Sequence, residues 1–369
     1  MSDRNPVGGA QGSGAPGSSI RIGALAPLSE PGWVDAGRHL LAGLELAVDE
    51  VNRTGIDGRP LRLVVRDTAA DPRRAEAAVD ELAERGVVAL AGEYHSVVAR
   101  AAAARAHALG LPFLCSSAVL DHLTDERTDW VARLAPAQSH GWRLYADYLV
   151  SAGHTHVAVA AQESLYWASG VHILRRALAP HHGSVRELLL GDLGVDGVCA
   201  RLVESGATAL LLLMGYPEPA ASLVRAVRAD HRLDAVKIGA PAGQPELSGW
   251  SALLGDQAGA IPFLRYMPDQ LTAHGQRVER ALRARLGVEP SFVAFEGYDT
   301  IQVLTEQLRS RGTHAAGVAA WADVATEGTR GLIRFSREED LNLWQWRWAP
   351  VQVVERDPSA SAEFTVLSP

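Results

Sequence analysis

The sequence predicts an α/β protein of two lobes, each a doubly wound parallel sheet covered by helices on both faces. The chain has 369 residues, more than the roughly 250–300 at which one hydrophobic core stops growing. Short apolar runs alternate with segments whose apolar residues recur at helical spacing, the pattern of buried parallel strands between helices. The alternation supplies enough strands for two sheets. A ligand site is therefore expected beyond the carboxyl ends of the strands.

The first half begins with an apolar run that ends at Pro27, and a helix follows in which Leu40, Leu44 and Val51 share one face. A later helix opens at the pair Asp71 and Pro72, because Pro is tolerated in the first helical turn. The strands expected in this half are 20–26, 61–65, 87–91, 112–115 and 156–160, and the helices are 39–52, 72–86, 97–109 and 140–152.

The second half repeats this alternation without a short internal repeat. The strands expected there are 184–190, 209–214, 236–239, 259–263, 331–335 and 343–348, and the helices are 170–178, a segment ending at Ser205, 219–229, 270–286 and 292–309. In the last strand, Trp344, Trp346 and Trp348 fall on one face. We interpret them as a hydrophobic face on the hinge side of the second lobe, with a stacking platform for an aromatic ligand as the alternative.

Composition narrows the classes of partner. The formal charge of −8 and the pI of about 5.9 argue against nucleic-acid binding, which requires concentrated Lys and Arg.

Residues 1–19 contain no apolar core of a signal peptide and predict a disordered tail, and no later run reaches membrane-spanning length. The sequence as written therefore predicts a cytoplasmic protein without membrane insertion, or an extracytoplasmic one if the true start differs.

Catalytic and metal motifs are missing from the sequence. Cys115, Ser116 or Ser117 could act as nucleophile with His95 or His122 as base, since all lie near strand ends. No GxSxG, P-loop, GxGxxG or HExxH motif accompanies them. The two cysteines, Cys115 and Cys199, lack metal-ligand spacing and predict buried free thiols. We expect no enzyme, no metal and no cofactor.

Five segments resemble one family in order and spacing. They are IRIGALAPLSEPGW (20–33), GLELAVDEVN (43–52), GIDGRPLRLVVRDTAADP (55–72), FEGYDTIQVL (295–304) and GLIRFSREEDLNLWQWRWAPVQVV (331–354). Together they resemble the type I periplasmic binding protein fold, in its branch of leucine/isoleucine/valine-binding receptors of ABC transporters. The resemblance covers nearly all of 20–357.

The resemblance implies three chain crossings between the lobes, near 133–138, 263–268 and 335–341. The first lobe would then comprise 20–137 and 266–337, the second 138–265 and 338–358, with a C-terminal tail at 359–369. Such receptors close by a hinge motion on a small polar or amphipathic molecule, here amino-acid-like or amide-like. The implied partners are this ligand and a transporter permease. The alternative is a cytoplasmic sensor that reports to a regulatory protein, as amide-sensing relatives do.

The resemblance also implies ligand contacts in the first lobe. Trp33 stands where the family often has an aromatic over the ligand, and Ser96 with His95 stands where a hydroxyl and backbone amides hold a carboxylate. Ser96 could instead be only an N-cap. In the loop formed by Ser116, Ser117 and Ala118, the family's usual Thr is replaced by Val119.

In the second lobe the resemblance implies contacts from Tyr166, Trp167 and Tyr216. Ala242 stands where amino-acid receptors have an acidic residue that pairs with the ligand ammonium. Glu93, Glu163 or Glu246 could supply that charge, or each could be a solvated loop residue. We therefore expect free leucine, isoleucine and valine to bind weakly.

Overall fold

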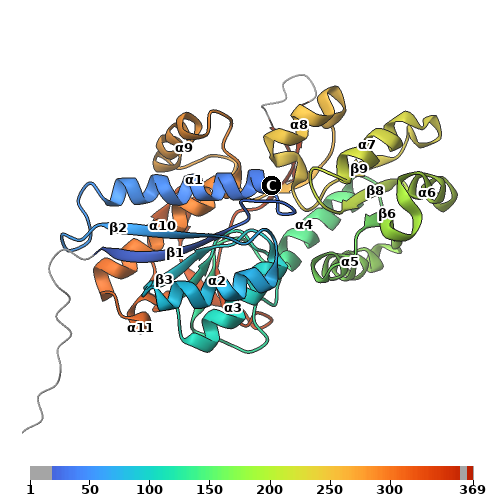
Figure 1. Cartoon of the computed structure of the whole chain (residues 1–369). Coiled ribbons are helices and arrows are strands. Elements are labelled where there is room, and N and C mark those ends of the chain that lie inside the picture. The colour runs from blue at the N-terminus through green and yellow to red at the C-terminus, as the bar shows by residue number, and fades with distance from the viewer. Residues whose placement is uncertain (1–18, 358–363, 369) are drawn as a thin grey trace, which may run out of the picture.

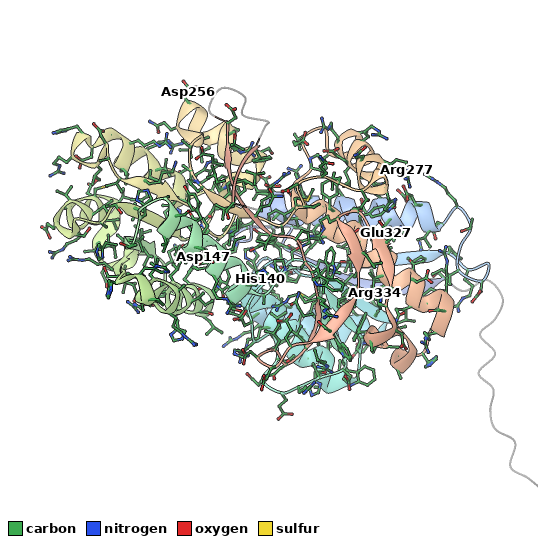
Figure 2. The ribbon with its side chains drawn as sticks, turned by 180° about the vertical axis from the view of Figure 1, so that it is seen from behind. His140, Asp147, Asp256, Arg277, Glu327 and Arg334 are labelled. Carbon is green, nitrogen blue, oxygen red and sulfur yellow. The ribbon has the colours of Figure 1, made fainter. Side chains whose placement is uncertain are left out.

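The computed structural model describes residues 19–357 and 364–368. They form two α/β lobes that lie side by side (Figure 1), and the predicted fold class is confirmed. Figure 2 shows the lobes from behind, with Glu327 in the first lobe and Asp147 in the second. The expected disordered tail at 1–19 falls almost entirely outside the described residues.

The sheet of the first lobe has seven strands in the order β13-β14-β5-β4-β3-β1-β2. All neighbours are parallel except β13 and β14. The strands are β1 (Ile20–Ala26), β2 (Leu61–Asp67), β3 (Ala89–Gly92), β4 (Phe113–Cys115), β5 (Val131–Arg133), β13 (Phe335–Arg337) and β14 (Trp344–Trp346).

Helices cover both faces of this sheet because successive strand residues point to opposite sides. Ala89 and Ala91 pack with the helices α1 and α10, whereas Leu90 packs with α2 and α3. In Figure 1, α1 and α9 lie above the sheet and α2 and α3 below it. The helices are α1 (Val34–Val51), α2 (Pro72–Glu84), α3 (Ser96–Leu109), α9 (Ala273–Leu286), α10 (Phe292–Arg311) and α11 (Ala315–Val318), with the strand pair β11 (Thr326–Gly328) and β12 (Gly331–Ile333).

The second lobe contains a parallel sheet in the order β7-β6-β8-β9 and a separate antiparallel sheet, β10-β15-β16. Its strands are β6 (His156–Ala161), β7 (Ser184–Leu189), β8 (Ala209–Leu213), β9 (Lys237–Gly239), β10 (Phe263–Arg265), β15 (Gln352–Arg356) and β16 (Phe364–Ser368). Its helices are α4 (Gln138–Ser151), α5 (Leu165–Leu178), α6 (Leu190–Ser205), α7 (Ala220–Ala229) and α8 (Ser248–Leu254).

The end of the chain differs from the expected domain boundaries. Residues 338–358 were expected in the second lobe, but β14 pairs with β5 in the sheet of the first lobe. The Arg133 guanidinium donates to the Gln345 side chain over 2.7 Å, and both residues are buried. The chain therefore crosses after Trp346 rather than at 335–341. The expected tail at 359–369 is also wrong in part, because 364–368 forms β16 against β15.

The three alternating tryptophans do not form one common face. The Arg337 guanidinium stacks on Trp344 and that of Arg330 lies over the buried Trp346. Trp348 lies beyond the strand and is 59% exposed. A hydrophobic face of the second lobe is wrong, because β14 belongs to the sheet of the first lobe. A stacking platform is wrong as well, since none of the three lines the cavity described below.

The helices α1 and α10 approach each other at backbone distance. A Cβ atom placed on Gly43 would lie 1.9 Å from the carbonyl oxygen of Ala294, and one on Gly297 would lie 2.4 Å from that of Leu40. Only glycine allows this approach at either position. It holds the middle of α1 against the first turns of α10.

Replacing Gly43 by alanine should therefore lower the thermal unfolding midpoint, because the added methyl group forces two backbones apart. Overpacking of this kind costs about 1–3 kcal/mol. Gly191→Ala is the matched control, since nothing lies within 4 Å of its Cβ position, and its midpoint should stay the same or rise slightly. Equal midpoints for both variants, measured by circular dichroism, would show that α1 and α10 do not pack this closely.

Candidate functional site

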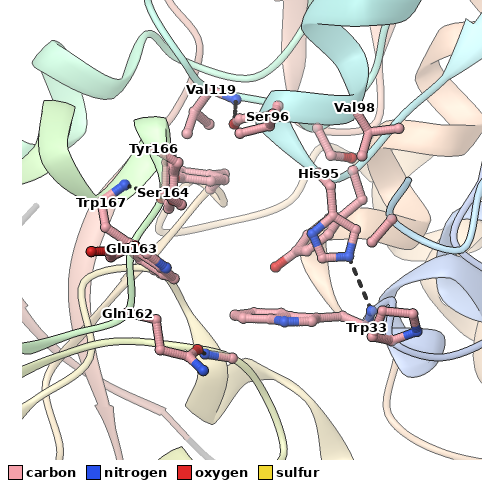
Figure 3. A pocket seen from close by; sticks show the side chains of 18 of the residues that line it. Trp33, His95, Ser96, Val98, Val119, Gln162, Glu163, Ser164, Tyr166 and Trp167 are labelled. Atoms are coloured by element: carbon pink, nitrogen blue, oxygen red, sulfur yellow. Dashed lines mark hydrogen bonds between the residues drawn. The ribbon is translucent and has the colours of Figure 1, made fainter. Parts of the chain in front are cut away.

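A cavity of about 480 Å³ lies between the lobes (Figure 3). It is built where loops follow the carboxyl ends of parallel strands, as expected for doubly wound sheets. The first lobe and its crossing segment contribute Pro31, Trp33, Ala70, Tyr94, His95, Ser96, Val97, Val98, Ser117, Val119, Tyr266 and Phe292, and the second contributes Gln162, Glu163, Ser164, Tyr166, Trp167, Gly215 and Ala242.

Aromatic side chains form much of the cavity wall. Trp33 and Tyr94 have ring centroids 5.6 Å apart. The pairs Tyr166 with Trp167 and Tyr266 with Phe292 have centroids 4.6 and 4.8 Å apart. Such rings present a large apolar surface that loses little conformational entropy on binding.

The loop after β3 is shaped by Gly92 and Glu93. Gly92 has φ of 111°, and a Cβ there would lie 2.0 Å from the Leu25 carbonyl oxygen, so only glycine fits. The Glu93 carboxylate accepts the backbone N–H groups of Tyr94 and His95 and the Thr68 hydroxyl, at 2.8, 2.9 and 2.7 Å. Burial raises the Glu93 pKa to about 7. Glu93 thus serves as an internal brace for the loop and does not line the cavity.

His95 is neutral and holds Trp33 in place. Its Nε2 accepts the backbone N–H of Trp33 over 3.0 Å (Figure 3), and burial lowers its pKa to about 4. His95 therefore lines the cavity without supplying a positive charge or a free basic nitrogen on Nε2.

Ser96 connects two loops of the site. Its Oγ accepts the backbone N–H groups of Val119 and Leu120, each over 3.2 Å. The interpretation of Ser96 as an N-cap is wrong, because His95 is the cap residue of α3 and Ser96 is already helical. The Ser96 hydroxyl proton remains available as a donor, and the first turn of α3, with Val97 and Val98, lines the cavity.

The cavity brings together seven of the ten residues predicted as ligand contacts: Trp33, His95, Ser96, Ser117, Tyr166, Trp167 and Ala242. Ser116 is fully buried and its hydroxyl bonds to Thr300 over 2.8 Å. Ala118 is also fully buried. Tyr216 lies behind Trp33, at 5.4 Å between rings, and its hydroxyl donates to Asp35 over 3.0 Å. These three do not line the cavity. Direct ligand contact by the seven stays a prediction.

Several lining residues were missed in the sequence. Tyr94 directly precedes the predicted His95, and Tyr266 falls in the expected crossing at 263–268. Both could therefore have been predicted as cavity residues from the sequence. Phe292 was treated only as the start of a helix. Of the proposed substitute charges, Glu163 is exposed at the cavity edge. Glu246 instead pairs with Arg265 over 3.0 Å.

The nucleophile and base candidates are not assembled for catalysis. Burial raises the Cys115 pKa to about 12, so its thiol stays protonated. Ser116 is bonded to Thr300, and His122 is exposed. Within residues 19–357 and 364–368, no group of three or more His, Cys, Asp or Glu side chains could hold a metal ion. No helix in the same part of the chain is long and apolar enough to cross a membrane.

Comparisons with known proteins identify the family. The model of the family described as "Periplasmic binding protein" matches residues 19–353. Leu/Ile/Val-binding protein homolog 7 of Brucella abortus (strain 2308) is 31% identical over 132 residues, which make up 35% of this chain and 33% of that protein. The chain thus aligns with about a third of the length of the curated relatives it matches.

Solved structures share the fold over almost the whole chain. The branched-chain amino acid binding protein LivJ of Streptococcus pneumoniae, in complex with isoleucine, has a TM-score of 0.80 at 20% identity, covering 95% of this chain and 100% of that one. A solute-binding protein of R. palustris in complex with benzoate has a TM-score of 0.79 at 20% identity, covering 95% and 97%.

The family match covers most of the sequence and agrees with the two-lobed architecture and the cavity between the lobes. It confirms the predicted resemblance and the expectation that the protein is not an enzyme. The chain belongs to the periplasmic binding protein family.

Proposed function

We propose that the chain is a solute receptor that closes its lobes on a small aromatic or amphipathic carboxylate. The observation that carries the proposal is the composition of the cavity. Six aromatic side chains line the same cavity as the first turn of α3, and so does Ala242, which the resemblance aligns with an ammonium-binding acid of amino-acid receptors. The volume of about 480 Å³ lies within the roughly 300–1,000 Å³ typical of small-molecule sites.

The carboxylate end of the ligand would lie at the first turn of α3. The unpaired N–H groups there carry the positive end of the helix dipole, and Ser96 adds a hydroxyl donor. Among the residues that the structure describes, no Lys or Arg lines the cavity, and His95 is neutral. The dipole and neutral donors would therefore hold the anion.

The apolar body of the ligand would lie between the two lobes. Trp33 and Tyr94 cover it from the first lobe, and Tyr166 with Trp167 covers it from the second. A flat ring can stack on such walls, and stacking adds about 0.5–1.5 kcal/mol per aromatic pair to the energy of burial.

An α-amino group would find little compensation near Ala242. Its methyl side chain offers no charge-assisted hydrogen bond, and Glu163 at the cavity edge is exposed to solvent. The fold itself accommodates both classes of ligand, since one structural neighbour was solved with isoleucine and another with benzoate. The choice of an aromatic acid therefore rests on the lining residues of this chain.

The partner and location follow from the role. Members of this family normally work outside the cytoplasm, and delivery to a transporter permease is the role we propose for this chain. The cytoplasmic location and the sensor role stay predictions from the sequence. Fractionation of the native host with an antibody distinguishes them: recovery outside the cytoplasm supports delivery to a permease, and recovery only inside it supports the sensor.

Calorimetry should show that the protein binds aromatic acids at least about ten-fold more tightly than leucine, isoleucine or valine, a difference of about 1.4 kcal/mol. Ala242→Glu should reverse this order, because the new carboxylate pairs with an ammonium group and repels an anion. Trp348→Phe is the control and should change neither affinity, because Trp348 is exposed and does not line the cavity. Micromolar binding of any of the three amino acids by the unmodified protein would exclude our ligand class.

Closure should depend on a hydrogen bond outside the cavity. The Tyr216 hydroxyl of the second lobe donates to Asp35 of the first. Tyr216→Phe keeps the ring contact with Trp33 but removes this bond, worth about 0.5–1.5 kcal/mol. We expect ligand dissociation to become about 2-fold to 10-fold faster in stopped-flow measurements.

Asp35→Ala should produce the same acceleration, and the double variant should add nothing because a single bond is lost in each case. Asp35→Asn retains an acceptor and should have a smaller effect. Unchanged dissociation in Tyr216→Phe would mean that the lobes close without this bond.

A further inference from the structure

A group of buried hydroxyl and carboxyl side chains lies beneath the cavity, where the loop after β4 packs against α10. The Ser116 hydroxyl bonds to that of Thr300 over 2.8 Å, and the Thr300 hydroxyl donates to the backbone carbonyl of Glu296 over 2.7 Å. These bonds place the neighbouring Ser117 beside Glu296. Glu296 follows the cavity residue Phe292 by four positions and so lies on the same face of α10.

Glu296 is fully buried and only half satisfied. Its Oε1 accepts from the Arg330 guanidinium over 3.2 Å, whereas its Oε2 has no hydrogen-bond partner among the described residues. Asp299 shares the same guanidinium at 3.2 Å, so one buried cation faces two carboxyl groups. Burial raises the Glu296 pKa to about 7, and Arg330 and the Ser117 hydroxyl oppose this rise.

Ser117 is the link between this carboxyl group and the cavity. Its side chain lines the cavity, the residue is only 4% exposed, and its Oγ forms no hydrogen bond of good geometry within the described chain. A buried hydroxyl and a buried carboxylate oxygen that lack partners are both costly to leave unpaired. Rotation of the Ser117 hydroxyl toward Glu296 Oε2 would satisfy both.

That rotation has a consequence for recognition. When the Ser117 proton is donated to Glu296, only the oxygen lone pairs remain to face the cavity. We propose that Glu296 is a positioning residue that holds Ser117 as a hydrogen-bond acceptor, so that the receptor selects carboxylates carrying a second group that donates a hydrogen bond, a hydroxyl or an N–H. This inference rests on the proposed function.

Replacing Glu296 by glutamine should reverse the polarity of Ser117. Arg330 would keep the amide oxygen on its side, which leaves the amide NH₂ facing Ser117. The NH₂ would then donate to the Ser117 oxygen, and the serine proton would turn toward the cavity. The variant keeps the shape of the site, but it should lose the preference for a donor on the ligand.

Asp299→Asn is the matched control. It also removes a carboxylate that pairs with Arg330, but Asp299 is occupied by the backbone N–H and the hydroxyl of Thr329, at 2.7 and 2.9 Å. If the buried group of Glu296, Asp299 and Arg330 had only a structural role, Glu296→Gln and Asp299→Asn would change the ligand preference in the same way. Ser117→Ala removes the proposed acceptor itself and leaves Glu296 in place.

The experiment compares benzoate with the three monohydroxybenzoates by calorimetry on the full chain. In the unmodified protein and in Asp299→Asn, at least one hydroxybenzoate should bind about ten-fold more tightly than benzoate. In Ser117→Ala and Glu296→Gln, the affinity for that hydroxybenzoate and the affinity for benzoate should agree within about two-fold. The affinity for benzoate itself should change little. Thermal unfolding checks that each variant is folded, and Ser117→Ala decides the question if Glu296→Gln is not.

The outcomes separate the inference from the function on which it rests. If none of the four acids binds the unmodified protein, the proposed function fails. If benzoate binds as tightly as every hydroxybenzoate, or if Glu296→Gln keeps the preference, the role of Glu296 is overturned while the proposed function stands. Equal loss of the preference in Asp299→Asn would also overturn it, since the cluster would then act only as a structural unit.

Discussion

The backbone approach of α1 to α10 is the constraint on which the site depends. Trp33 directly precedes α1 and Phe292 begins α10, so both cavity walls stand at helix starts. Further along the two helices, the contact at Gly43 and Gly297 packs them backbone to backbone, because any larger side chain would strike a backbone carbonyl. A rigid first lobe therefore presents preorganised rings to the ligand, which reduces the entropy lost on binding.

The electrostatics of the cavity differ from those of a site built on opposite charges. Burial shifts two groups in the loop after β3 toward their neutral forms: the pKa of His95 falls to about 4, and that of Glu93 rises to about 7. Helix N–H groups, hydroxyls and the Gln162 amide are the neutral polar groups that can meet a ligand, while the Glu163 carboxylate lies exposed at the cavity edge. Neutral donors are less costly to desolvate than full charges, and they suit a receptor that must release its ligand again.

Most of the fold could be predicted because buried parallel strands and amphipathic helices have distinct periodicities. The lobe to which the end of the chain belongs was harder to predict, because 335–337 and 344–346 are short strands. Their place in the first lobe depends on pairing with Arg133, which is distant in the sequence. In the site, Trp33 and Ser96 could be assigned to the cavity because the loops after β1 and β3 correspond to ligand-holding loops in the family that the sequence resembles. Tyr216 was misplaced because its ring turns toward Asp35, and Glu296 was overlooked because a helix interior in the sequence does not reveal which side chains lie beneath a cavity.

The contact between Trp33 and Tyr216 joins the two lobes, with 5.4 Å between their rings. Trp33 is 7% exposed when the lobes touch, and separation of the lobes would bring its indole into water. Indole emission shifts to longer wavelength in a polar medium, so the receptor contains its own optical reporter of opening. The remaining tryptophans, of nine in the sequence, contribute a background that a Trp33→Phe variant would reveal. The contact between Trp33 and Tyr216 thus gives the protein a label-free signal of lobe separation, without a dye attached to either lobe.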